Sequence, residues 1–328
     1  MEFHPAVIFV AGLVIIILGA EMILRSASRI AIMLHIKPII IGLTIVSIGT
    51  STPELAVGLT ANFGGKGELA IGNIIGANLF NILFILGLSA AIRALPIHGQ
   101  SLKLDLPMIF FSALLLLFLS YDGVISQFDG GILLLVGILY TISLIYLSRK
   151  ESIAIQHEFV EAYGAEKMIT TWTATSKIWN LLILCSGMAM SVLGANLLVD
   201  SAVSIAESYG VSNAIIGLTI VAFGTSSPEL VTTLLATFKN DRDVAIGNLI
   251  GSGIYNILFI LGMVTFVVPG GVNVGLDVLW IDLPLMIAVS LLCYPIFKSN
   301  KMVSRKEGVL FVSLYCIYIG VLLSRLQS

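Results

Sequence analysis

Ten long apolar segments run through this 328-residue chain and limit how it can fold. They lie near residues 6–24, 39–62, 69–92, 106–120, 130–148, 178–199, 213–238, 244–268, 279–297 and 308–324. Each has about the length that a helix needs to cross a hydrocarbon core of about 30 Å. Only 11% of the residues are charged, against roughly a quarter in soluble domains. Because backbone groups in lipid must be satisfied within the segment, the sequence predicts an all-α membrane protein with ten transmembrane helices.

The basic residues predict how these helices are oriented. Of the 17 Lys and Arg residues, all but Lys66 and Arg325 fall in alternate loops between the predicted spans. Cytoplasmic loops carry an excess of Lys and Arg, so the loops with most of these residues are expected in the cytoplasm. The sequence therefore predicts a multi-pass protein of the cell membrane with both termini extracytoplasmic.

The two halves of the chain are copies of one another. Residues 42–63 match residues 217–238 at 14 of 22 positions, and residues 69–87 match 244–262 at 13 of 19, both at an offset of 175. We divide the chain into a first five-helix repeat at 1–148, a cytoplasmic linker at 149–177 and a second five-helix repeat at 178–328. Because five is odd, the second repeat must be inverted. Inverted repeats are typical of secondary transporters, whose substrate site lies near the midplane.

Glu54 and Glu229 occupy equivalent positions near the middle of two predicted spans. An ionised carboxylate at this depth costs on the order of 2.5–3.5 kcal/mol, so it normally faces a partner or a cavity. No Lys or Arg lies at comparable depth in any predicted span, which favours a bound cation as the countercharge. Protonated glutamates that only link helices are the alternative, but a symmetric pair inside a polar motif argues against it.

Oxygen-bearing residues surround both glutamates. Pro53 and Pro228 each remove a helix N–H and displace the carbonyls one turn earlier. At i,i+4 spacing, a threonine hydroxyl shares a helix face with each glutamate. These threonines are Thr50 and Thr225, and Ser47, Ser51 and Ser226 add further oxygens. A set of hard oxygens without His or Cys favours Na⁺ or Ca²⁺ over zinc or copper.

The segments that follow each glutamate motif add a stripe of polar and small residues. The stripe consists of Asn73, Ala77 and Asn81 in the first half, and of Asn248, Ser252 and Asn256 in the second. Glycines at i,i+4 spacing beside it permit close helix approach. We expect Asn81 and Asn256 to bind the cation, whereas Asn73 and Asn248 are at least as well explained as braces between helices.

The motifs GTSTPE at 49–54 and GTSSPE at 224–229 each precede a G-N-x-x-G-x-x-x-x-N segment, giving paired motifs at 49–81 and 224–256. They resemble the two α-repeats of the calcium/cation antiporter superfamily, most closely its prokaryotic sodium/calcium exchanger branch. The resemblance implies electrogenic exchange of Na⁺ for Ca²⁺ by alternating access, with spans one and six sliding across the rest and with no cofactor.

The resemblance also implies the residues of the ion pocket. Glu54 and Glu229 would bridge the ions, with hydroxyls and carbonyls from Thr50, Ser51, Thr225 and Ser226. Backbone carbonyls of Ser47 and Ala222 and side chains of Asn81, Ser252 and Asn256 would complete the pocket.

This chain departs from the family pattern at two positions, 77 and 256. Family members often carry Ser where Ala77 stands, and many carry Asp in place of Asn256. The pocket would therefore hold two ionisable groups, which argues against potassium dependence and leaves both Na⁺ and H⁺ open as the driving ion.

Three other functions remain to be weighed against Na⁺/Ca²⁺ exchange. The nearest is H⁺-driven antiport in the same fold, because burial disfavours the charged form of a carboxylate. A cation channel would more naturally show an oligomeric pore than an inverted repeat. An intramembrane enzyme would need a base that the spans do not supply, so we expect no enzyme. We infer no nucleic-acid or obligatory protein partner besides the bilayer, and we expect Asp105 and Asp282 to cap helices.

Overall fold

The computed structural model of the chain describes residues 4–34, 38–97, 104–150, 174–208, 222–239 and 241–325. Within these ranges the protein is almost wholly helical, and helices occupy the described part of every segment predicted to span a membrane. Most of the predicted linker at 149–177 lies outside the described residues.

The helices of the N-terminal part include two π-helical segments, labelled η. They are α1 (Pro5–Leu34), α2 (Pro38–Ile41), η1 (Gly42–Val46), α3 (Ser47–Thr50), α4 (Thr52–Phe63), α5 (Gly67–Leu79), η2 (Phe80–Leu86), α6 (Gly87–Ile92), α7 (Leu106–Leu119) and α8 (Gln127–Lys150).

The C-terminal part repeats much of this order. Its helices are α10 (Ala174–Ser208), α12 (Ala222–Thr225), α13 (Ser227–Phe238), α14 (Arg242–Tyr255), η6 (Asn256–Leu261), α15 (Gly262–Val267), η7 (Val278–Asp282), α16 (Leu283–Asn300) and α17 (Arg305–Arg325).

Six helical stretches among the described residues are long and apolar enough to cross a membrane. They are Pro5–Ala27, Gly67–Ile92, Gln127–Tyr146, Lys177–Ser201, Asp243–Val267 and Val278–Ser299. The protein is therefore a helical, multi-pass membrane protein, but this count does not reach ten.

Several predicted spans fall short for identifiable reasons. The segment at 39–62 is divided among four short helices, and α7 has 14 residues, which gives a length of about 21 Å. Part of the segment at 213–238 lies outside the described residues. Ten spans therefore remain a prediction.

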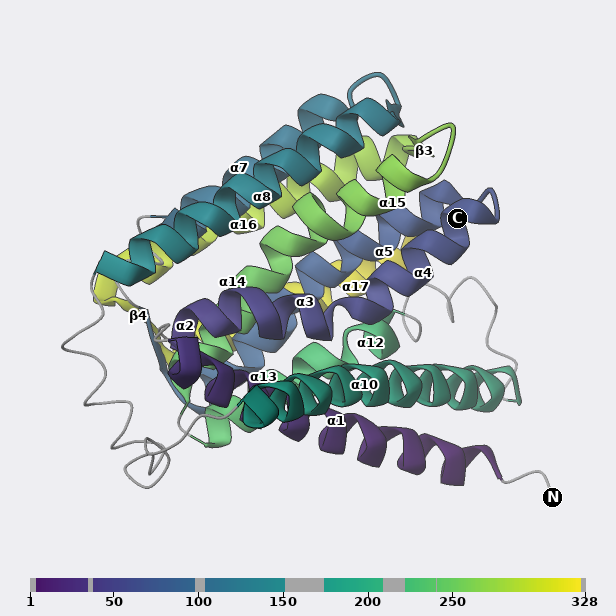
Figure 1. Ribbon diagram of the computed structural model, residues 1–328. Coiled ribbons are helices and arrows are strands. Elements are labelled where there is room, and N and C mark those ends of the chain that lie inside the picture. The colour runs from purple at the N-terminus through teal and green to yellow at the C-terminus, as the bar shows by residue number, and fades with distance from the viewer. Residues whose placement is uncertain are drawn as a thin grey trace.

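Helices α1 and α10 lie side by side along one flank of the bundle (Figure 1). Glycines bring their backbones together. A Cβ added to Gly12 would lie 2.9 Å from the Gly194 carbonyl oxygen, and one added to Gly194 would lie 2.8 Å from that of Gly12. Gly19 and Gly187 approach each other in the same reciprocal way, at 2.8 and 2.9 Å. Such small residues allow helices to pack closely in membranes, so larger side chains here would force the pair apart.

Two short strand pairs join the N-terminal and C-terminal parts. Strand β1 (Leu95–Pro96) pairs with β4 (Met302–Val303), and β2 (Val124–Ile125) pairs with β3 (Val272–Asn273), both antiparallel. The two pairs lie at opposite ends of the bundle, near the labels β4 and β3 in Figure 1. Each end of the molecule is thus fastened by backbone hydrogen bonds between distant parts of the sequence.

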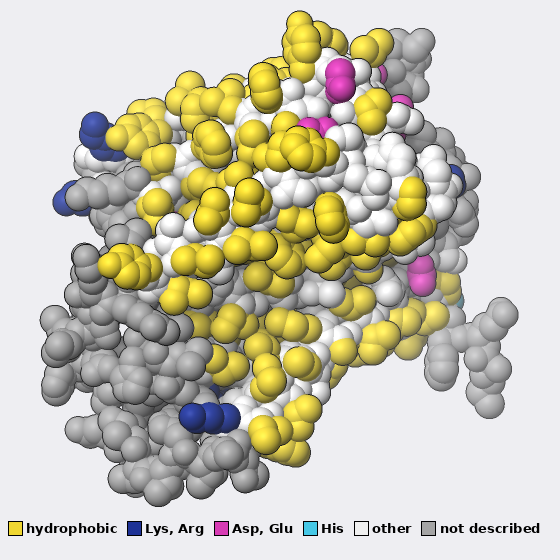
Figure 2. Space-filling model, turned by 45° about the horizontal axis from the view of Figure 1, so that its top comes forward, with side chains coloured by type: hydrophobic (Ala, Val, Ile, Leu, Met, Phe, Trp, Pro, Cys, Tyr) yellow, Lys and Arg dark blue, Asp and Glu magenta, His cyan; other side chains and the backbone are white. Residues whose placement is uncertain are grey.

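The outer surface is strongly apolar. Figure 2 shows a broad face covered by hydrophobic side chains, with few charges and with Lys and Arg mainly at its margins. Large apolar side chains such as Phe118 and Ile317 are exposed. Such a surface would be a liability in water but suits a protein surrounded by lipid.

The two aspartates expected to cap helices do not do so with their side chains. Asp105 and Asp282 precede α7 and α16, but neither side chain makes a capping hydrogen bond. Both residues already have helical backbone angles, so the helical path begins before them. Instead, Tyr140 donates to Asp105 at 2.9 Å and Tyr318 to Asp282 at 3.4 Å. These bonds connect α7 with α8 and α16 with α17.

Candidate ion-binding site

Each glutamate follows a break between two helices, and the two breaks have nearly identical backbone geometry. Ser51 separates α3 from α4 with φ −80° and ψ 9°, and Ser226 separates α12 from α13 with φ −88° and ψ 8°. Each new helix has its proline at the first or second position, where a missing N–H costs nothing. Glu54 and Glu229 follow in the first turn, where the helix dipole favours negative charge.

Each glutamate is held by the serine of the other motif. The Ser51 hydroxyl donates to Glu229 Oε1 at 2.9 Å, and the Ser226 hydroxyl donates to Glu54 Oε1 at 3.0 Å. Both glutamates are fully buried. This crossed arrangement brings the two helix breaks together, although 175 residues separate them.

The threonines of the two motifs contact the asparagines of the following helices. Thr50 donates to Asn248 Oδ1 at 3.2 Å, and Thr225 donates to Asn73 Oδ1 at 3.3 Å. Asn248 also donates to Thr233 on α13 at 3.1 Å. Asn248 thus connects three helical segments, which supports the bracing role rather than the ligand role for this residue.

Ser47 joins η1 to α14, and its polar groups are engaged. Its hydroxyl hydrogen-bonds the carbonyl oxygens of Gly42 at 2.6 Å and Asn248 at 3.0 Å. Its carbonyl oxygen accepts the Thr50 hydroxyl at 3.3 Å and the Ser51 N–H at 3.0 Å. Ala222, its predicted counterpart, opens α12 at the edge of the described residues.

Asn81 and Asn256 lie in the π-helical segments η2 and η6. Such segments are frequent at functional sites. Both residues are fully buried, as is Ser252 one turn before Asn256. The Asn256 amide nitrogen donates to Asn78 Oδ1 at 3.2 Å. Asn78 is the polar residue that the sequence analysis missed, because its repeat counterpart is Gly253 and comparison of the two halves hides it.

Several buried oxygens of the predicted pocket lack a hydrogen-bond partner among the described residues. They are Glu54 Oε2, Glu229 Oε2, Asn81 Oδ1, Asn256 Oδ1 and Ser252 Oγ. A buried polar atom without a partner costs about 1–3 kcal/mol, and more when charged. Carboxylate, amide and hydroxyl oxygens are the ligands that hard cations prefer. The arrangement is therefore suited to a cation that contacts both halves.

The described ion pairs lie away from this pocket. Glu21 on α1 pairs with Arg25 one turn later, with Nε and Oε1 2.5 Å apart, and also with Lys239 at the end of α13. No described Lys or Arg pairs with Glu54 or Glu229. Their negative charge is thus not balanced by a described basic side chain.

A scan against protein-family models matches the family described as "Sodium/calcium exchanger protein" at residues 4–146 and 179–324. The sodium/calcium exchanger MaX1 of Methanosarcina acetivorans is 30% identical over 347 residues, which covers 96% of this chain and 97% of that protein. The inner membrane protein YrbG of Escherichia coli is 30% identical over 319 residues, covering 96% of this chain and 95% of that protein.

The fold also matches solved structures of the sodium-calcium exchanger NCX_Mj. One superimposes with a TM-score of 0.81 and 28% sequence identity, covering 98% of this chain and 99% of that one. The family match and the full-length relatives lead to one conclusion: this chain belongs to the sodium/calcium exchanger protein family.

Proposed function

We propose that the protein exchanges Na⁺ for Ca²⁺ across the membrane by alternating access. The observation that carries this proposal is the crossed pair of buried glutamates, each with one carboxylate oxygen bonded to a serine and the other without a described partner. The family to which this chain belongs points to the same function. A transporter of this kind performs no covalent chemistry and needs no cofactor.

The proposed ligands are the residues inferred from the sequence. Glu54 and Glu229 bind the ion directly, and Asn81, Asn256 and Ser252 contribute the remaining bare oxygens. Thr50, Ser51, Thr225 and Ser226 contribute hydroxyls and carbonyls, and Ser47 and Ala222 contribute carbonyls. Two carboxylates balance one Ca²⁺, whereas several Na⁺ leave net positive charge. This difference makes exchange sensitive to membrane voltage.

We propose the ten-span architecture with two inverted halves, 1–148 and 178–328, joined by the linker at 149–177. Reciprocal contacts support it, because a two-fold relation pairs residue i with j and the copy of j with the copy of i. Gly12 contacts Gly194 and Gly19 contacts Gly187, and at the offset of 175 residues Gly187 is the copy of Gly12 and Gly194 is the copy of Gly19. The crossed serine–glutamate bonds obey the same rule.

Basic residues at one end of the bundle support the proposed orientation. Arg93, Lys298, Lys301 and Arg305 lie in or beside the elements joined by the β1–β4 pair. We place this end in the cytoplasm, following the positive-inside rule. Both termini then lie outside the cell.

Uptake of radioactive Ca²⁺ into Na⁺-loaded proteoliposomes tests the function. We expect uptake that needs internal Na⁺ and that is lost in Glu54→Gln and in Glu229→Gln. Glu68→Gln makes the same chemical change at an exposed residue and should transport normally. Wild-type uptake by the double Glu54→Gln, Glu229→Gln variant would contradict the site.

The same vesicles separate the competing functions. A pH gradient without Na⁺ should not support uptake; if it does, H⁺ is the driving ion. Single-channel conductance steps in a planar bilayer would instead favour a channel.

A further inference from the structure

A chain of hydrogen bonds behind the pocket ends at the candidate ligand Asn256. The Asn78 amide nitrogen donates to the Gly253 carbonyl oxygen at 3.2 Å and contacts Met286 Sδ at 3.7 Å. The Asn78 oxygen accepts the Asn256 amide nitrogen at 3.2 Å. Asn256 Oδ1, at the end of this chain, is buried and has no partner among the described residues. Asn78 itself is buried, with only 1% of its surface exposed.

The Gly253 carbonyl fixes the direction of the whole chain. A carbonyl oxygen can only accept a hydrogen bond, so the Asn78 amide must turn its NH₂ group toward it. The Asn78 oxygen then faces Asn256, and because this oxygen accepts, Asn256 must donate from its own NH₂ group. That leaves the Asn256 oxygen, and not its NH₂ group, directed away from Asn78. The orientation follows from the donors and acceptors of the network, which is the basis on which side-chain amides are assigned.

The equivalent asparagine in the first half has no such support. Asn81 Oδ1 and Nδ2 both lack partners among the described residues. The residue that would orient it is Gly253, the repeat counterpart of Asn78, and glycine has no side chain to donate or accept. The two asparagines are therefore not equivalent, although the repeat makes them look so.

We propose that Asn78 is a positioning residue that holds the oxygen of Asn256 toward the transported cation. This role rests on the proposed Ca²⁺ transport, but it belongs to a residue that does not touch the ion. Asn256 with its NH₂ group facing the pocket would present a donor to a cation and repel it. Asn78 excludes that orientation before the ion arrives, so no binding energy is spent in selecting it.

Equilibrium binding of radioactive Ca²⁺ to the purified full-length protein in detergent tests this role. Asn78→Leu preserves most of the side-chain volume but removes both hydrogen bonds, and we expect Ca²⁺ affinity to fall about tenfold. The matched control is Asn62→Leu. Asn62 is a buried asparagine whose amide also donates across the molecule, to the Val264 carbonyl at 3.1 Å, but it has no described contact with Asn256. Its Ca²⁺ affinity should stay within about twofold of wild type.

A double-mutant cycle distinguishes positioning from a general effect on folding. If Asn78 acts through Asn256, then Asn78→Leu should have no further effect on Ca²⁺ affinity in an Asn256→Ala background. A full tenfold loss in that background would overturn the proposal, as would wild-type affinity in Asn78→Leu alone. If Asn78→Leu does not give folded protein, Asn78→Ala enters the same cycle. A wild-type protein that binds no Ca²⁺ would overturn the proposed function as well, so the two failures are distinguishable.

Discussion

The two halves of this protein are most alike where their helix breaks meet at the centre and less alike in the outer helices α8 and α17. At the centre, the helix breaks at Ser51 and Ser226 differ by less than ten degrees in both backbone angles, and each serine reaches the opposite glutamate. Because these residues of the two halves contact each other, a substitution in one half alters the surroundings of residues in both halves.

The outer helices show the contrast. Gly137 on α8 lets that helix approach η6, with 3.2 Å between its added Cβ and that of Leu258, and Thr141 bonds Tyr255 at 2.7 Å. When Gly130 of α8 is aligned with Gly308 of α17, Tyr315 takes the place of Gly137, and its ring packs against Phe80 and Phe84 at centroid distances of 5.4 and 5.5 Å.

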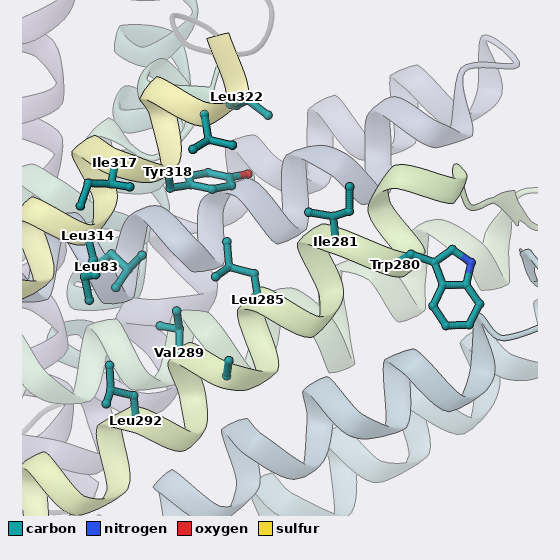
Figure 3. A pocket seen from close by; sticks show the side chains of 12 residues that line it. Leu83, Trp280, Ile281, Leu285, Val289, Leu292, Leu314, Ile317, Tyr318 and Leu322 are labelled. Carbon is teal, nitrogen blue, oxygen red and sulfur yellow. The ribbon is translucent and has the colours of Figure 1, made fainter. Parts of the chain in front are cut away.

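An apolar cavity of about 710 Å³ lies between α16 and α17, behind η2. Figure 3 shows Leu285 and Val289 of α16 on one side of it and Ile317 and Tyr318 of α17 on the other, with Leu83 beside Leu314. Apolar packing tolerates exchange among hydrophobic side chains, so the two copies were free to diverge here.

The largest expected effect tests whether the two carboxylates are equal. Glu54→Gln and Glu229→Gln should each lower Ca²⁺ affinity by about 100-fold, because each removes one of two charges that balance the ion. Equilibrium Ca²⁺ binding measures both. A loss of Ca²⁺ affinity in only one of the two variants would show that the two carboxylates do not contribute equally.

The crossed serines should give a smaller, matched pair of effects. Ser51→Ala and Ser226→Ala each remove one hydrogen bond to a buried carboxylate, worth about 1.5–3 kcal/mol, and should lower Ca²⁺ affinity by about tenfold or more. In the Glu229→Gln background, Ser51→Ala should lose most of its effect, because the two residues are bonded. Independent effects there would show that the crossed contacts do not matter.

A difference between the halves at the start of α14 predicts a pH effect on stability. Burial, together with the charge of Asp243, raises the pKa of Asp241 to about 7, and its carboxylate caps α14 by accepting the Val244 N–H at 3.3 Å. The counterpart Lys66 makes no such cap. Because the pKa is higher in the folded state than in the unfolded state, Asp241 favours folding most below about pH 4, and this contribution is lost as the pH rises to 7.

Asp241→Asn keeps a good capping residue but removes the titration. At pH 8 we expect the variant to be more stable by about 1 kcal/mol, or about 2–4 °C in Tm. The gain should shrink toward pH 4, as measured by thermal unfolding in detergent. A gain of equal size at both pH values would contradict the assignment of the titration to Asp241.

The smallest effect concerns the cavity of Figure 3. Counting from the D-L-P sequences at 105–107 and 282–284, Ala288 in the cavity wall corresponds to Phe111. Ala288→Phe should fill part of the space and raise stability by about 0.5–2 kcal/mol without changing Ca²⁺ affinity. Ala288 and Phe111 are both exposed, so the reverse change, Phe111→Ala, makes the matched comparison in the first half and should have little effect. Destabilisation by Ala288→Phe would mean that the cavity must remain open.

The sequence by itself determined the class of protein and the centre of the candidate site. The apolar segments required helices in a membrane, and the exact offset of 175 residues marked Glu54 and Glu229 as a pair. Both inferences rest on local properties: hydrophobic length, and identity between a residue and its copy. The membrane class and the family are confirmed, whereas ten spans and the ligand roles remain predictions.

Only the tertiary structure decided which residues of the two halves meet. It paired Ser51 with Glu229, bonded Asp105 to Tyr140 where a helix cap was expected, and placed Asn78 behind Asn256. Comparing the copies cannot reveal such contacts, because it aligns each residue with its counterpart and not with its neighbour. Asn78 is the residue that comparison of the two halves is least able to identify, because its counterpart in the second half is a glycine.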